Sequence, residues 1–194
     1  MISKKPTREE ALELFRKYNK SDSLYKHALS VEAVMRYMAR KQGEDEEMWG
    51  VVGLIHDLDY EMYPDQHCTM TEKIMREEGW PEEYIRAVIS HGYGICSDTE
   101  PQTLLEKTLF AIDELTGLVT TSALVRPSRS VLDMEARSVR KKWTDKRFAA
   151  GVDRSVIEQG AAKLGADLNE LISDTIMGMR EAADEIGLRG NPQL

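Results

Sequence analysis

The chain has 194 residues and a formal net charge of −8, from 26 lysines and arginines against 34 aspartates and glutamates. This excess of negative charge argues against a polyanion binder, and therefore against nucleic acid as a partner. The start, MISKKPTREE, lacks the apolar core of a signal peptide, and no stretch approaches the ~20 apolar residues of a membrane span. With only two cysteines, Cys68 and Cys96, we expect a cytoplasmic protein that does not associate with membranes.

Helical periodicity dominates the sequence in chain order. Thr7 and Glu10 form a capping box that predicts a first helix ending near Tyr18. A serine or aspartate at 21–23 caps a second helix, which ends near Gly43. Further helices are expected at about 45–58, 66–78, 81–91, 102–123, 130–142, 153–164 and 167–186, and residues 188–194 should fray. Because no run alternates with period two, the fold class is all-α, a compact helical bundle forming one domain over 1–194.

All four histidines of the chain fall where a side chain is expected to face the interior: His27, His56, His67 and His91. His56 is followed by Asp57 at the end of an apolar run. A further aspartate, Asp113, lies on the inner face of the long helix expected over 102–123. Each imidazole could be a core residue satisfied by one hydrogen bond. A shared cation is the simpler hypothesis, because imidazole nitrogen and carboxylate oxygen are ligands for Fe, Mn, Zn, Co and Ni.

The order His27, His56-Asp57, Asp113 on helices resembles the HD superfamily of metal-dependent phosphohydrolases, which is named after its His-Asp pair. The resemblance implies that these four residues bind a divalent transition metal. It covers about residues 20–125 and leaves 126–187 as a C-terminal helical extension. The segments HDLDYEMYPDQH, ISHGYG and AIDELTGLV look like an HDIG-like group of predicted bacterial HD hydrolases. The doublet nevertheless continues as HDLDY, without the glycine and lysine of the HDIGK motif found in nucleotide-signalling phosphodiesterases.

His67 and His91 lie between the doublet and Asp113, which is similar to the dinuclear branch of the superfamily. That resemblance implies a second metal ion, with Asp57 bridging the two ions as the central catalytic residue. A helical hairpin turning near 79–81 would return His91 to the neighbourhood of His67. The alternative is that both histidines bind substrate phosphate or line the pocket, so the sequence predicts one or two ions per chain.

A basic segment follows the expected metal site. Residues 126–154 contain nine lysines and arginines against four acidic residues, a local charge of +5 on an otherwise acidic chain. Such a patch can hold an anionic substrate or can be a solvated helix face. Arg126 is the predicted phosphate ligand, because it follows the Asp113 motif closely and a guanidinium suits phosphate.

The leading functional hypothesis is a metal-dependent phosphohydrolase acting on a small phosphate ester or nucleotide, a small anionic phosphorylated substrate. Asp59, Glu61 and Glu114 are candidates to orient the ligands or to shuttle protons, without a ranking among them. The same six ligands would serve a di-iron oxygenase. A third hypothesis is a metal-containing, ligand-binding regulatory module without turnover. The oligomeric state is left open.

Overall fold

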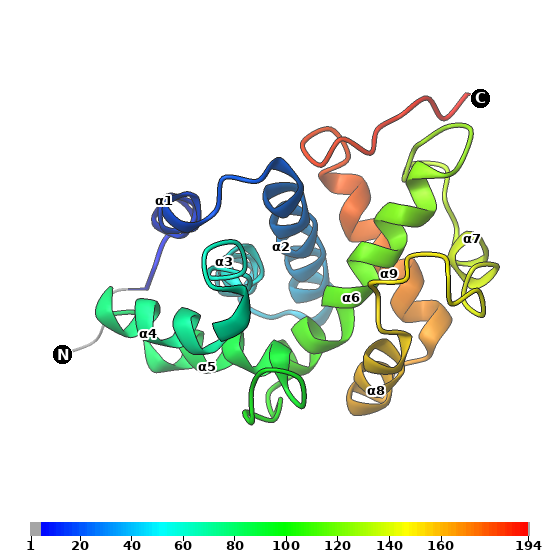
Figure 1. The fold of residues 1–194 in the computed structure, drawn as a ribbon. Helices are drawn as coiled ribbons and strands as arrows, with labels where there is room; N and C mark the ends of the chain where they lie inside the picture. Colours follow the sequence, from blue (N-terminus) through cyan, green and yellow to red (C-terminus); the bar gives the residue numbers. More distant parts are fainter. Residues whose placement is uncertain (1–4, 194) are drawn as a thin grey trace.

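A computed structural model describes residues 5–193, and this part of the chain folds into nine α-helices and two short 3₁₀-helices with no strand (Figure 1). The all-α prediction is therefore confirmed. No helix in the described part of the chain is long and apolar enough to cross a membrane. The elements are α1 (Arg8–Tyr18), α2 (Asp22–Gln42), α3 (Glu46–Ile55), η1 (Pro64–Gln66), α4 (Thr69–Glu77), α5 (Glu82–Ile89), η2 (Ser90–Gly92), α6 (Leu104–Leu124), α7 (Ala136–Arg140), α8 (Arg154–Leu164) and α9 (Leu168–Glu181).

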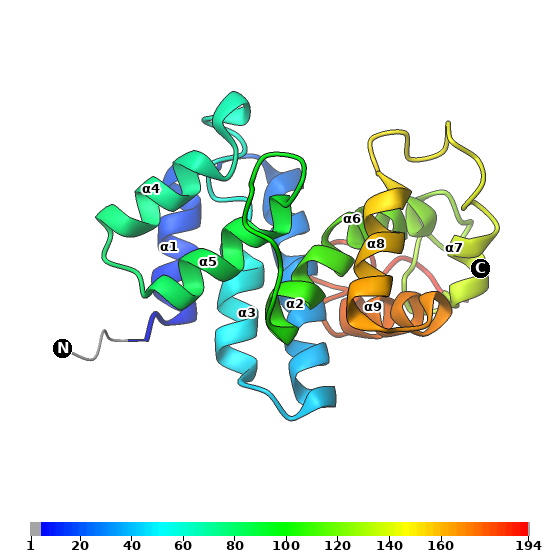
Figure 2. The same ribbon diagram turned by 90° about the horizontal axis from the view of Figure 1, so that it is seen from below.

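The long helix α2 is the centre of the arrangement, because it packs against α3, α6 and α9. On one side, α1 and α5 pack against α3, and α4 packs against α5. On the other side, α8 and α9 pack against α6, and α7 packs against α9. Figures 1 and 2 show these two groups of helices separated by α2 and the beginning of α6. The core is thus shared between elements that are distant in the sequence.

Capping residues explain where the main helices begin and end. Thr7 and Glu10 make both hydrogen bonds of the predicted capping box at the start of α1. The Ser21 hydroxyl accepts from a backbone N–H of the first turn of α2, and Gly43 ends that helix with φ +72°, a left-handed conformation that favours glycine. These caps confirm the predicted boundaries of the first two helices.

The interface between α2 and α3 requires a small residue at Gly53. A Cβ atom there would lie 3.1 Å from the Cα of Glu32 and 3.1 Å from the carbonyl oxygen of Val31. Any larger side chain would therefore push α3 away from α2. Because His56 follows Gly53 by three residues, this close contact also sets how near the doublet approaches α2.

Several predicted helices are shorter in the structure. The helix expected to reach residue 58 ends at Ile55. The helix expected from residue 66 begins only at Thr69, because η1 and Cys68, which has φ +65°, come before it. The helix expected over 130–142 is reduced to 136–140, and the last helix stops at Glu181. Residues 188–194 were expected to fray, and the last of them lies outside the described residues. Instead Leu188 is buried, and its carbonyl accepts a hydrogen bond from the Val131 N–H. Apolar burial and this backbone hydrogen bond hold Leu188 in place, and local periodicity does not reveal either of them.

Candidate metal centre

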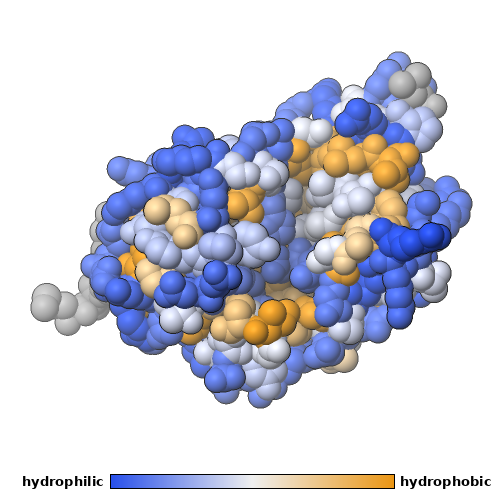
Figure 3. All heavy atoms as spheres, in the orientation of Figure 1, coloured by the Kyte–Doolittle hydropathy of each residue, from blue (hydrophilic) through white to orange (hydrophobic). Residues whose placement is uncertain are grey.

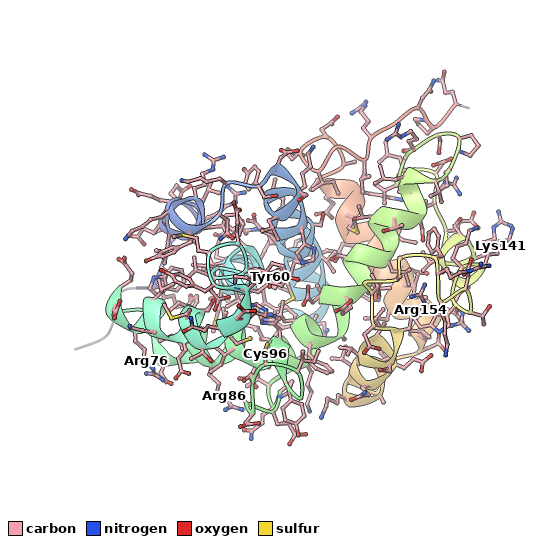
Figure 4. The ribbon with its side chains drawn as sticks, viewed as in Figure 1. Tyr60, Arg76, Arg86, Cys96, Lys141 and Arg154 are labelled. Atoms are coloured by element: carbon pink, nitrogen blue, oxygen red, sulfur yellow. The ribbon has the colours of Figure 1, made fainter. Side chains whose placement is uncertain are left out.

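The six predicted ligands meet at one place between the two groups of helices. His27 comes from α2 and Asp113 from the middle of α6, while His56 and Asp57 follow the last turn of α3. His67 lies between η1 and α4, and His91 lies in η2, directly after α5. The place is visible in Figure 4 beside the labelled Tyr60 and Cys96. Segments separated by up to 86 positions along the chain therefore supply one cluster.

One half of the cluster consists of His27, His56, Asp57 and Asp113. The Nε2 atom of His27 lies 3.2 Å from Nε2 of His56 and 3.0 Å from Oδ1 of Asp113. Asp57 Oδ2 lies 3.4 Å from Nε2 of His56 and 3.7 Å from Nε2 of His27. Nε2 of His56 is 3.3 Å from Asp113 Oδ1. Four potential ligand atoms thus surround one point.

The other half of the cluster consists of His67, His91 and the second oxygen of Asp57. The Nε2 atoms of the two histidines are 3.1 Å apart. Asp57 Oδ1 lies 3.4 Å from His67 Nε2 and 3.5 Å from His91 Nε2. The two oxygens of this carboxylate therefore face different halves of the cluster. The hairpin of α4 and α5 brings His67 and His91 together as predicted, although both lie just outside the helices.

Hydrogen bonds made by Nδ1 determine which ring nitrogen of His56 and of His91 has a lone pair available to bind a metal ion. His56 Nδ1 lies 2.8 Å from the carbonyl oxygen of Gly53, and His91 Nδ1 lies 2.6 Å from that of Val88. Because a carbonyl oxygen only accepts, both Nδ1 atoms must donate. In the neutral rings, Nε2 therefore carries a lone pair directed into the cluster.

The same assignment holds for the other two histidines. His67 Nδ1 donates to the buried Asp59 carboxylate at 2.7 Å. The Thr116 hydroxyl gives its only proton to the carbonyl oxygen of Asp113, so its oxygen accepts from His27 Nδ1 at 3.4 Å. All four histidines thus present Nε2 lone pairs to one another and to carboxylate oxygens.

Such a convergence of acceptor atoms is unfavourable unless positive charge lies between them. Divalent transition metals at about 2.1 Å from their ligands separate neighbouring ligand atoms by roughly 3.0 Å in octahedral and 3.4 Å in tetrahedral geometry. The separations in both halves, between 3.0 and 3.7 Å, lie close to these values. The residues of the cluster therefore fit the metal ion that the sequence predicts.

In the metal-free protein, protons must provide this positive charge. Burial lowers the pKa of His56, but the carboxylates of Asp57 and Asp113 outweigh burial and raise it well above its ordinary value. Burial raises the pKa of Asp57, yet the neighbouring imidazoles hold it well below its usual range. Asp113 behaves in the same way. A metal ion entering this cluster must consequently displace protons.

A cavity of about 330 Å³ opens onto the cluster. Figure 3 shows the molecule hollowed at its centre, with apolar residues along the lower edge of the hollow. Among the described residues, no lysine or arginine lines this cavity, whereas Glu114 does. Burial and the adjacent Asp113 charge raise the pKa of Glu114 to about 7. The remaining wall is largely apolar and contains Leu24, Tyr60, Ile95, Phe110 and Val156.

Arg126, the predicted phosphate ligand, does not lie with the other six residues. It follows the end of α6, and the eleven residues from Asp113 to the helix end carry the chain about 16 Å away along the axis. Its guanidinium contacts the carboxylate of Asp133 and the hydroxyl of Ser138. The basic segment is only partly remote: Figure 4 places Lys141 well away from Cys96, whereas the Asp153 N–H donates to Glu114 on the cavity wall.

The structure ranks the candidates for orienting the ligands. Asp59 is fully buried, holds His67 through Nδ1 and also accepts from the backbone N–H of Thr71 at 2.8 Å. Glu61 instead accepts from the backbone N–H groups of Lys20 and Ser21, outside the cluster. Sequence reasoning did not identify Thr116, which lies one helical turn after Asp113 and faces His27. That i, i+3 spacing was the only signal for it.

Residues 24–118 match the family model described as the HD domain. This segment is an HD domain. The match contains all six clustered residues and confirms the superfamily predicted from the doublet, whose members are typically metal-dependent phosphohydrolases. Comparisons with curated proteins and with solved structures gave no significant match. The family and a cluster able to hold metal are therefore shown by independent observations.

Proposed function

We propose that the protein is a metal-dependent phosphohydrolase acting on a small phosphate ester. The observation that carries this proposal is the convergence of four histidine Nε2 atoms and two carboxylates inside an HD domain. His27, His56, Asp57 and Asp113 would hold one divalent ion, and Asp57, His67 and His91 a second. Bound divalent ions would generate a hydroxide nucleophile near neutral pH and polarise the phosphoryl group.

Asp57 has the central role in this proposal. Its two oxygens face the two halves of the cluster, so this one carboxylate would contribute a ligand atom to each half. The four imidazoles are held by their Nδ1 hydrogen bonds, which limits reorientation of the rings. Buried Asp59 adds negative charge behind His67 and makes that imidazole a stronger ligand.

The acidic and apolar composition of the cavity wall favours a small substrate that carries little charge beyond one phosphate group. Asp57, Asp113 and Glu114 line the cavity, and no described lysine or arginine faces them. Metal ions would therefore supply the positive charge for the phosphate. A triphosphate would place additional negative charge against an acidic and apolar wall, which is unfavourable. We infer a phosphate monoester whose organic part contacts Tyr60, Ile95 or Phe110, in preference to a nucleoside triphosphate.

The decisive experiment combines elemental analysis with a substrate panel. Protein purified without chelators should contain bound transition metal and release inorganic phosphate from aryl phosphates and nucleoside monophosphates. Chelation should abolish this activity, and metal addition should restore it. The panel is repeated without oxygen, because the di-iron oxygenase alternative requires oxygen for turnover. Phosphate release with nucleoside triphosphates alone would contradict the inferred substrate, whereas nucleotide binding without any product would favour the regulatory module.

A further inference from the structure

Two thiols lie in contact beside the cavity, one on its wall (Cys96) and one buried behind it (Cys68). Cys68 Sγ and Cys96 Sγ are 2.9 Å apart, although the residues are 28 positions apart in the chain. Both are free thiols in the structure, and they are the only cysteines of the sequence. We propose that Cys68 and Cys96 form a redox-active dithiol, which a small disulfide such as oxidised glutathione converts into an intramolecular disulfide. This proposal goes beyond the phosphohydrolase function and does not depend on it.

The backbone around the pair brings the sulfurs together. Cys68 has φ +65° and ψ −43°, a positive-φ conformation that is uncommon for residues other than glycine, at the position just before α4. On the opposite side, the backbone N–H groups of Ile95, Cys96 and Ser97 all donate to the carbonyl oxygen of Gly92. This tight turn fixes Cys96 against Cys68. Strained backbone at a thiol that touches a second thiol indicates a built arrangement and not a chance contact.

Gly92 leaves the space that both sulfurs use. A Cβ atom at this position would lie 2.3 Å from the sulfur of Cys96 and 2.5 Å from that of Cys68. Any other residue would force the thiols to move. The sulfurs would need to approach by about 0.9 Å to reach the ~2.05 Å of a disulfide bond. The sulfurs therefore need only a small movement to form the bond.

The two thiols differ in access, which sets the order of reaction. Cys96 is partly exposed and lines the cavity, whereas Cys68 is only 3% exposed. The Cys96 thiolate attacks one sulfur of oxidised glutathione, and the first glutathione leaves as a thiolate. The Cys68 thiolate then attacks the Cys96 sulfur and expels the second glutathione. Two protein thiols thus lose two electrons and two protons, and one small disulfide becomes two thiols.

The disulfide would join two segments that carry predicted metal ligands. Cys68 follows His67 directly, and Cys96 lies in the turn that follows His91. Oxidation would therefore tie the 92–97 turn, including the exposed Ile95 on the cavity wall, to the beginning of α4. The cavity wall would carry a thiol in the reduced protein and a disulfide in the oxidised protein.

The test treats metal-loaded, full-length protein with oxidised glutathione and follows its intact mass. The wild type should lose two hydrogen atoms, remain monomeric on a non-reducing gel and retain no glutathione. Trypsin should then release residues 42–73 linked to residues 87–107, because each of these peptides contains one cysteine. Dithiothreitol should restore the original mass.

Two matched variants test the order of reaction. Cys68→Ser should retain one glutathione on Cys96, because no second thiol can expel it. Cys96→Ser should react at least tenfold more slowly, because Cys68 is buried. A wild type that stays reduced, keeps bound glutathione or forms disulfide-linked dimers would overturn the proposal. Equal reaction rates of the two single-cysteine variants would overturn the proposed order.

Discussion

The substitution Asp59→Asn tests the two-metal arrangement without removing any ligand. Asp59 is fully buried, and its two oxygens accept from His67 Nδ1 at 2.7 Å and from the Thr71 N–H at 2.8 Å. Asparagine retains one acceptor oxygen and replaces the other with an NH₂ donor. One of the two buried donors must therefore lose its partner.

The size of the effect follows from the bond that is lost. A hydrogen bond to a charged group contributes about 1.5–3 kcal/mol, and ~1.4 kcal/mol corresponds to a factor of ten in an equilibrium constant. We therefore expect Asp59→Asn to lower the affinity for one of the two metal equivalents by roughly 10–100-fold. Loss of a residue that orients a metal ligand commonly has an effect of this size. The other equivalent should bind with unchanged affinity, because none of its proposed ligands contacts Asp59: His27, His56, Asp57 and Asp113.

Competition with a metal chelator, followed by elemental analysis, measures both affinities. Glu61→Gln is the matched control, because Glu61 is a nearby carboxylate that accepts from two backbone N–H groups outside the cluster. Circular dichroism establishes that both variants are folded. Wild-type affinity for both equivalents in Asp59→Asn would refute this role of Asp59, and so would an equal loss of affinity for both equivalents in the folded variant.

Further predictions address the other parts of the site. His56→Ala or Asp57→Ala should abolish most metal binding, because each removes a ligand from the centre of the cluster; full metal content in both variants would contradict this. His67→Ala or His91→Ala should lose about one equivalent and keep the other, unless the wild type itself binds a single ion. Arg126→Ala should leave KM and metal content unchanged and lower Tm, because its guanidinium pairs with Asp133 and no described arginine lines the cavity. A KM raised about tenfold at constant metal content would instead show that Arg126 binds substrate phosphate. Metal occupancy should fall as the pH decreases, beginning above the ordinary histidine pKa of about 6.5, because the raised pKa of His56 makes protons compete with metal. Metal titrations at several pH values measure this, and a pH-independent affinity would exclude such competition.

The amino-acid sequence determined the features that depend on neighbouring residues along the chain. Thr7 with Glu10 and Ser21 with Gly43 predicted the limits of α1 and α2, because capping uses atoms a few positions apart. The inward position of His27 and the doublet His56-Asp57 likewise followed from local periodicity. The order of these ligands was sufficient to predict the HD domain.

Tertiary structure decided the features that depend on distance in space. The sequence placed Arg126 near the Asp113 motif, but a continuous helix turns a short separation in sequence into about 16 Å. It offered three carboxylates to orient the ligands, and only packing shows that Asp59 is the one behind His67. The contact between Cys68 and Cys96 could not be predicted from the sequence either. It requires a residue with positive φ before α4 to pack against a turn 28 positions away in the chain. Local patterns specify which face of a helix is buried, whereas the partner of a buried polar atom is set by how separate segments pack together.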